Sequence, residues 1–164
     1  MKTTLEYLKD RYSEEQSRFD HFENKCTKFI TFVSIIIGVI TAVAGISKGI
    51  IFRPENPMAW VVLIAFLIGA FSIACAWGHS LLALRIGECP VLPHSRVAAE
   101  YLTTVDAETQ STYLYDCYIG TLEQLAKVIN EKSKNLEFAY QELVISAWGL
   151  AIAASLSIYM EIAK

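Results

Sequence analysis

The sequence predicts an all-α membrane protein with three transmembrane helices and long cytoplasmic helical extensions. Two observations lead to this prediction: three long stretches lack charged residues, and apolar residues beside them recur with helical spacing. The uncharged stretches cover residues 29–47, 58–84 and 143–160 and are 19, 27 and 18 residues long. A helix needs about 20 apolar residues to cross the hydrocarbon core of a bilayer. In addition, 54% of the 164 residues are hydrophobic, which is more than a soluble domain usually contains.

The uncharged stretches divide the chain into cytoplasmic and membrane segments. Three buried helices in a soluble core are the alternative, but a soluble domain of this size does not need so many helices that are apolar all round. The third span is the weakest, because it is short and begins beside Glu142. If it does not cross, everything after the second span is cytoplasmic. We expect an N-terminal helix over 1–28, a transmembrane hairpin over 29–84 with spans at about 29–47 and 58–84, a loop and long helix over 85–142, and a third transmembrane helix with its tail over 143–164.

Lysine and arginine counts predict the orientation. Six of these residues precede the first span and five lie between the second and third, whereas the first loop holds two and one follows the last span. Cytoplasmic flanks of membrane proteins are enriched in Lys and Arg. We therefore expect a multi-pass protein of the inner membrane with a cytoplasmic N-terminus and its C-terminus on the other side. Trp60 and Trp77 are placed to mark the two faces of the bilayer.

Two cytoplasmic segments show the apolar spacing of a coiled coil. Neither segment contains Pro, and apolar positions three and four apart alternate along each, as in a helix with one apolar seam. In the first segment, Glu15 alone breaks this alternation. Both patterns continue into a span without a break, so each helix and its span should form one rod. Lys132 is the one charged member of the second seam, and a short helix over about 96–104 should precede that seam. The residues expected to make seam or oligomer contacts are Leu5, Leu8, Tyr12, Phe19, Phe22, Tyr115, Tyr118, Leu122, Leu125, Ile129 and Leu136.

Small residues recur four apart in all three spans. In lipid, such residues let helix backbones approach closely, where no hydrophobic force drives association. Gly and Ala are common in spans in any case, but their number here favours packing beyond one subunit and hence a homo-oligomer. The residues expected to take part are Gly38, Ala42, Ala70, Ala74, Gly78, Gly149, Ala153 and Ser157.

No catalytic constellation is present in the sequence. We find no Gly-rich phosphate loop, nucleophile elbow or metal-binding His pair, and therefore expect no enzymatic activity and no cofactor. Cys89, Glu88 and His94 share one loop and are too few to predict a metal or thiol–imidazole site. His79 at a membrane edge could titrate, although such a residue more often lies at the headgroup level.

The charges also limit the partners and the transport chemistry. The four cysteines form no CxxC pair, so a disulfide framework is not expected. A net charge of −3 gives no nucleic-acid signature. The spans lack Asp, Glu, Lys and Arg, which argues against an ion-coupled transporter. A pore lined by hydroxyl groups stays open as an alternative, and its residues would be Ser34, Thr41, Ser72, Ser155 and Ser157.

The layout resembles small bacterial membrane effectors linked to antiphage defence, among them the SLATT-type proteins and the transmembrane effectors of CBASS, Pycsar and retron systems. The likeness covers most of the chain as an architecture, and its motif is a cytoplasmic helix that leads into a span. Two spans are usual in SLATT-type proteins, whereas three are expected here. The residues that carry the likeness are Tyr118, Asn130, Lys132, Leu136, Ala139 and Leu143.

The resemblance implies an oligomeric effector that perturbs the membrane or forms a pore. A cytoplasmic protein or nucleotide would trigger it, and a change in how the two seams pack would reorient the spans. The alternative is a membrane-anchored scaffold or regulatory subunit that binds a partner through its cytoplasmic helices.

Overall fold

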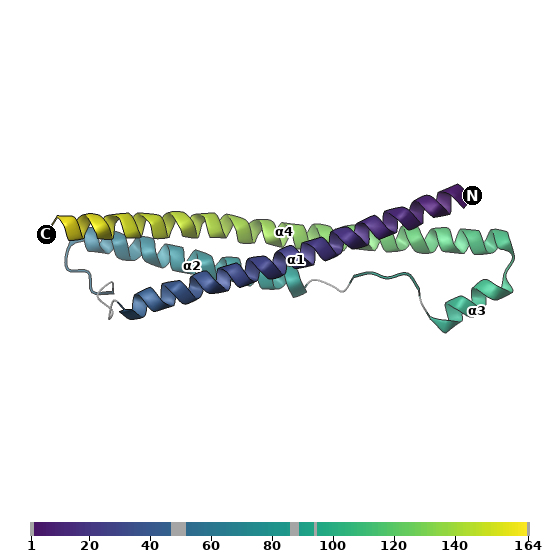
Figure 1. The fold of residues 1–164 in the computed structure, drawn as a ribbon, viewed down its shortest axis with the longest axis horizontal. Helices are drawn as coiled ribbons and strands as arrows, with labels where there is room; N and C mark the ends of the chain where they lie inside the picture. Colours follow the sequence, from purple (N-terminus) through teal and green to yellow (C-terminus); the bar gives the residue numbers. More distant parts are fainter. Residues whose placement is uncertain (1, 47–51, 86–88, 94, 164) are drawn as a thin grey trace. The chain divides into compact units, whose positions relative to one another are not determined.

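Four helices make up the described part of the chain (Figure 1). The computed structural model describes residues 2–46, 52–85, 89–93 and 95–163. No strand occurs in these ranges, so the expected all-α fold is confirmed for them. Both apolar seams lie on uninterrupted helices that continue into apolar sequence, as predicted. The helices are α1 (Lys2–Ile46), α2 (Pro57–Arg85), α3 (Arg96–Thr104) and α4 (Ala107–Ile162).

Local sequence explains where α2 and α3 begin. The side-chain oxygen of Asn56 accepts a hydrogen bond of 2.8 Å from the backbone N–H of Ala59, and Pro57 occupies the first helical position. Proline is favoured there because its missing N–H would have no helical partner. Ser95 caps α3 in the same way, accepting from the N–H of Ala98 at 3.2 Å. Each cap satisfies a backbone donor that the first helical turn leaves unpaired.

Asp106 fixes the start of α4. Its carboxylate accepts hydrogen bonds from the backbone N–H groups of Glu108 and Thr109 at 3.2 and 3.3 Å, and from the Thr109 hydroxyl at 2.7 Å. These bonds favour the charged carboxylate, so they hold the pKa of Asp106 below its ordinary value. The long helix therefore begins at a definite residue.

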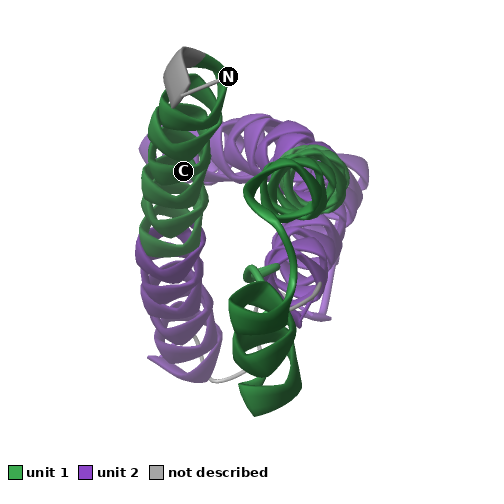
Figure 2. Cartoon of the chain, turned by 90° about the vertical axis from the view of Figure 1, so that its right-hand side faces the viewer, with its two compact units in different colours: residues 1–25, 86–133 green, residues 26–85, 134–164 purple. Residues whose placement is uncertain are grey.

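The chain forms two compact units (Figure 2). Unit 1 comprises Met1–Lys25 and Ile86–Ser133, and unit 2 comprises Cys26–Arg85 and Lys134–Lys164. Helices α1 and α4 each contribute residues to both units, whereas α2 belongs to unit 2 and α3 to unit 1.

Within the described residues, three helices are long and apolar enough to cross a membrane, as the sequence predicts. They are Thr4–Ile46, Pro57–Arg85 and Ala107–Ile162. Only 6%, 28% and 17% of the residues in their most apolar stretches are buried within the chain. Most of this apolar surface is therefore left for lipid or for another protein. The orientation in the membrane stays a prediction.

Unit 2 packs α1, α2 and α4 against one another. Val62 and Phe66 of α2 are buried with Ala153 of α4, and Ile40 and Ala44 of α1 pack on the same cluster. Each of these residues lies in an uncharged stretch of the sequence. The cluster therefore joins the three apolar helices within one chain.

The backbones of α2 and α4 approach most closely at two glycines. A Cβ atom added to Gly149 would lie 3.0 Å from the carbonyl oxygen of Ala65 and 3.1 Å from the backbone nitrogen of Gly69. A Cβ atom added to Gly69 would in turn lie 2.9 Å from the side chain of Leu150. Only glycine fits without displacement at this contact, which is the geometry that small residues allow between membrane helices.

Candidate functional site

The α1 and α4 segments of unit 1 pack along their seams in parallel. The rings of Tyr12 and Tyr118 meet edge to face with centroids 6.0 Å apart. One turn or two further along, Phe19 forms a buried cluster with Leu125 and Ile129. The order of contacts is the same on both helices, so their N-termini point the same way. Within unit 1, the two seams therefore pack against each other in one interface.

Lys132 follows this cluster and is the most unusual residue of the interface. Its side chain is 0% exposed, and its ammonium nitrogen lies 2.8 Å from Oε1 of Glu23 on α1. The same nitrogen lies 4.5 Å from the centre of the Phe19 ring, within the range of a cation–π contact. Lysine is almost never fully buried unless it is paired. The carboxylate and the ring together provide the compensation that a buried ammonium requires.

The structure places the remaining seam residues at different depths. Leu8 is buried, and Tyr115 is 43% exposed. At the outer end of the seam, Tyr115 lines a small recess with Leu5 and Thr4. The half-buried members of the seam are Leu5, Tyr12, Phe22, Tyr118, Leu122 and Leu136.

Cys89 packs against the buried cluster of unit 1 from the segment that follows α2. Burial and the nearby carboxylates of Asp20 and Glu23 raise its pKa above the ordinary value, and Lys132 opposes that rise. A raised pKa keeps the thiol protonated and makes it a poor nucleophile. Among the described residues, no group of three or more His, Cys, Asp or Glu side chains could hold a metal ion. Glu88 and His94, which the sequence places in the same loop, lie outside the described residues.

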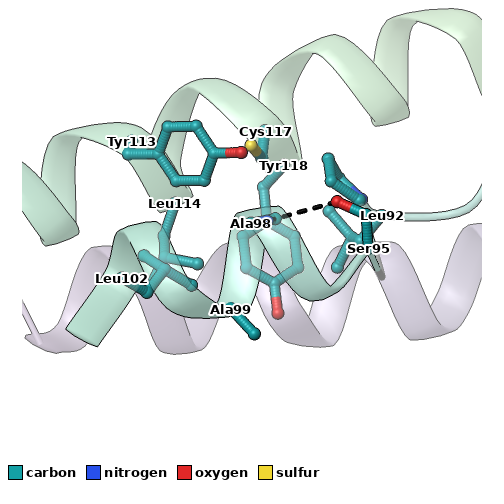
Figure 3. Close-up of a pocket in the computed structure, with 10 residues that line it drawn as sticks. Leu92, Ser95, Ala98, Ala99, Leu102, Tyr113, Leu114, Cys117 and Tyr118 are labelled. Atoms are coloured by element: carbon teal, nitrogen blue, oxygen red, sulfur yellow. Dashed lines mark hydrogen bonds between the residues drawn. The ribbon is translucent and has the colours of Figure 1, made fainter. Parts of the chain in front are cut away.

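A cavity of about 210 Å³ lies between α3 and α4 in unit 1 (Figure 3). Ala98 and Leu102 of α3 line one side, and Tyr113 and Cys117 of α4 line the other. The Tyr113 hydroxyl points toward the Cys117 thiol, and their hydrogen bond raises the pKa of Tyr113. The ring of Tyr101 lies 5.1 Å from that of Tyr113. Sequence reasoning missed this cavity, because its lining residues do not follow one helical spacing.

The predicted small residues of unit 2 fall into two sets. Gly149 and Ala153 are buried inside the chain, where Gly149 meets the backbone of α2. By contrast, Cβ atoms added to Gly38 and Gly78 would meet nothing within 4 Å. Ser157 is exposed, and its hydroxyl donates to the carbonyl oxygen of Ala153 at 2.8 Å. Of the other predicted members, Ala42 and Ala74 are exposed and Ala70 is half-buried.

Beside this contact, an apolar groove of about 480 Å³ runs between the three helices of unit 2. Ile40 and Val43 of α1, Phe66 of α2 and Leu150 of α4 are among its lining residues. Sequence reasoning did not anticipate the groove either, because it depends on how three helices come together.

Some polar side chains of the three apolar helices lie in unit 2. The indole N–H of Trp77 donates to the Ser34 hydroxyl at 3.2 Å, which links α2 to α1. The ring of His79 lies 5.6 Å from that of Phe138. Among the described residues, Nδ1 of His79 and the Ser146 hydroxyl are buried without a hydrogen-bond partner.

Comparison with known proteins finds no family model, curated protein or solved structure that matches this chain.

Proposed function

We propose that the protein is a non-enzymatic, oligomeric membrane effector that perturbs the bilayer when it is triggered. The observation that carries the proposal is the small buried share of its three apolar helices, which is 6%, 28% and 17%. A single chain leaves most of the surface of these helices uncovered, and lipid and further copies of the chain could cover it. Small exposed residues such as Gly38, Ala42 and Ala74 support close contact between copies.

The uncharged spans support membrane perturbation rather than ion-coupled transport. Transporters that move ions usually place ionisable side chains near the middle of the bilayer. The stretches 29–47, 58–84 and 143–160 contain no Asp, Glu, Lys or Arg. A pore in an oligomer would therefore be lined by hydroxyl groups or by apolar side chains.

The interface in unit 1 is the proposed control element. Helices α1 and α4 form the parallel seam there, and the same two helices contribute apolar segments to unit 2. A protein or nucleotide that separates or shifts the seam would act on two of the three spans directly. The pairing of the buried Lys132 with the partly exposed Glu23 supports two distinct states, because a buried charge is tolerated only when its partner is in place.

The cellular setting of the proposal comes from the resemblance to antiphage-defence effectors. We place the protein in the bacterial inner membrane with unit 1 on the cytoplasmic side, in line with the distribution of Lys and Arg. There it would stay silent until infection produced its trigger.

The experiment is controlled expression in bacteria, with membrane potential and dye entry recorded in the same cells. We expect the triggered or overproduced parent to depolarise the membrane. Ala42→Leu and Ala151→Leu replace small exposed residues on α1 and α4 and should reduce this effect at equal membrane abundance. Ile152→Leu keeps a large exposed side chain and is the matched control. A parent that never depolarises cells, even beside its native neighbours, would refute the effector proposal.

In that event the scaffold alternative takes its place. It is favoured by the exposed apolar side chains of α3, where Val97 is 75% and Tyr101 is 41% exposed. They lie on α3 in unit 1 and could contact a soluble protein. Val97→Asp would then weaken binding of that partner without any effect on the membrane potential.

A further inference from the structure

We infer that the pair of Lys132 and Glu23 decides which helix occupies the α4 seam: it holds α1 there and excludes α4 of a second copy. The inference rests on the proposed function only in treating the released seam as an assembly surface. The partner is therefore a second copy of this chain. Three observations support it: the burial of Lys132, its place in the heptad pattern and the chemistry that α1 offers to it.

Lys132 occupies the same heptad position as two core residues of the seam. Tyr118, Leu125 and Lys132 are spaced seven apart, so they follow one another on one side of α4. Two copies inserted in one membrane with the same orientation would bring their α4 helices together in parallel. In register, each residue at this position then faces its own counterpart. Two Lys132 ammonium groups would meet in the interface.

Such a meeting is strongly unfavourable because the position is dry. The Lys132 side chain is 0% exposed when the seam is covered. Like charges in a buried interface repel each other, and neither ammonium would find a carboxylate on the facing seam. A single buried polar residue of this kind is known to set the register and partner choice of coiled coils.

Helix α1 removes both problems at once. Glu23 places a carboxylate oxygen 2.8 Å from the ammonium nitrogen, and Phe19 places its ring 4.5 Å away. The Glu23 side chain is itself 44% exposed, so its own loss of hydration is incomplete. The pairing therefore favours α1 over α4 as the occupant, although both present apolar side chains.

The rest of the seam suits a second copy. Leu125 is 0% and Ile129 is 3% exposed beneath α1, and Leu122 lies on the same stripe. An identical stripe can pack against itself in a parallel pair, as in homomeric coiled coils. Without the charge at position 132, the α4 seam is thus a self-complementary surface.

The test measures contacts between copies on α4 directly. A photo-crosslinking amino acid is placed at Ala126, an exposed position beside the seam, in the full chain within its membrane. Lys132→Met removes the charge and keeps the length of the side chain. We expect it to raise the yield of crosslinked dimers at least several-fold over the parent. Lys127→Met, an exposed neighbour on the same helix, is the control and should leave the yield unchanged.

Glu23→Gln separates partner choice from simple bonding. Both Glu23→Gln and Lys132→Met break the ion pair, so a purely structural bond predicts the same outcome for both. Our inference predicts different outcomes. Lys132→Met should raise dimer crosslinking, whereas Glu23→Gln should not, because it leaves the lysine charge on α4. The exchanged variant, Glu23→Lys with Lys132→Glu, should keep the parent's low yield and guards against loss of folding.

The result that overturns the inference is a Lys132→Met yield no higher than that of the parent at equal abundance. Equal increases for Glu23→Gln and Lys132→Met would overturn it as well. Membrane leakage is recorded in the same cells as a separate readout. More crosslinking without leakage supports the inference and contradicts the proposed effector function. Leakage without more crosslinking supports the effector function and contradicts the inference.

Discussion

Truncation of the seam core is the sharpest test of the interface in unit 1. Leu125 is 0% exposed and packs with Phe19 and Ile129. Removing a buried leucine side chain down to alanine costs about 2–5 kcal/mol. Leu125→Ala should therefore lower the free energy of separating α1 from α4 by that amount. Because the three side chains touch, adding Ile129→Ala should cost less than the sum of the two single changes.

Hydrogen exchange on the detergent-solubilised chain measures this loss. Backbone amides of residues 107–133 exchange when the seam opens locally, so their protection reports the opening free energy. At 1.4 kcal/mol per factor of ten, the expected loss of protection is about 30-fold to about 4000-fold. Glu123→Ala and Lys127→Ala alter exposed positions of the same helix and should change protection little. If Leu125→Ala exchanges like these controls, the seam does not hold the unit together.

The other predictions concern unit 2, the topology and the thiol. Gly149→Leu should lower stability by about 1–3 kcal/mol through overpacking, because its Cβ would lie 3.0 Å from a backbone oxygen of α2. Gly45→Leu, which would also meet nothing within 4 Å and lies outside the proposed contacts, should not lower stability. Equal thermal melting of both variants by circular dichroism would contradict the close contact at Gly149. A reporter active only in the cytoplasm should work at the N-terminus and within residues 96–110 and fail after Lys164, and activity at the C-terminus would exclude three spans. The raised pKa of Cys89 should make its alkylation by iodoacetamide at pH 8 slower in the folded than in the denatured protein and faster as the pH increases; equal rates in mass spectrometry would refute the buried setting.

Much of the helical organisation could be predicted from the sequence. Helix α3 begins at Arg96 and ends at Thr104, as expected. Its start is set locally, because Pro93 precedes it and the Ser95 side chain caps its first turn. The continuity of α1 and α4 followed from apolar spacing without a helix breaker. These features depend on residues close together in the chain, for which local rules suffice.

The contacts between helices could be predicted only in part. Lys132 stood out as a charge in an apolar seam, but Glu23 was not identified as its partner, because that pairing depends on the register of segments far apart in sequence. Similarly, Gly149 was expected at a helix contact, whereas Gly69 was not. The face of α2 that meets α4 is rotated by about one residue from the predicted stripe of Ala70 and Ala74, and neighbouring residues of a helix point about 100° apart.

The division into two units also separates the chain's aromatic chromophores. All three tryptophans, Trp60, Trp77 and Trp148, belong to unit 2, whereas unit 1 contains tyrosine but no tryptophan. Trp60 and Trp148 are 54% and 69% exposed, and Trp77 donates its indole N–H to Ser34. Fluorescence excited selectively at the indole rings therefore reports on unit 2 alone. Emission quenched by brominated acyl chains would follow their contact with lipid, while events confined to the seam would stay optically silent.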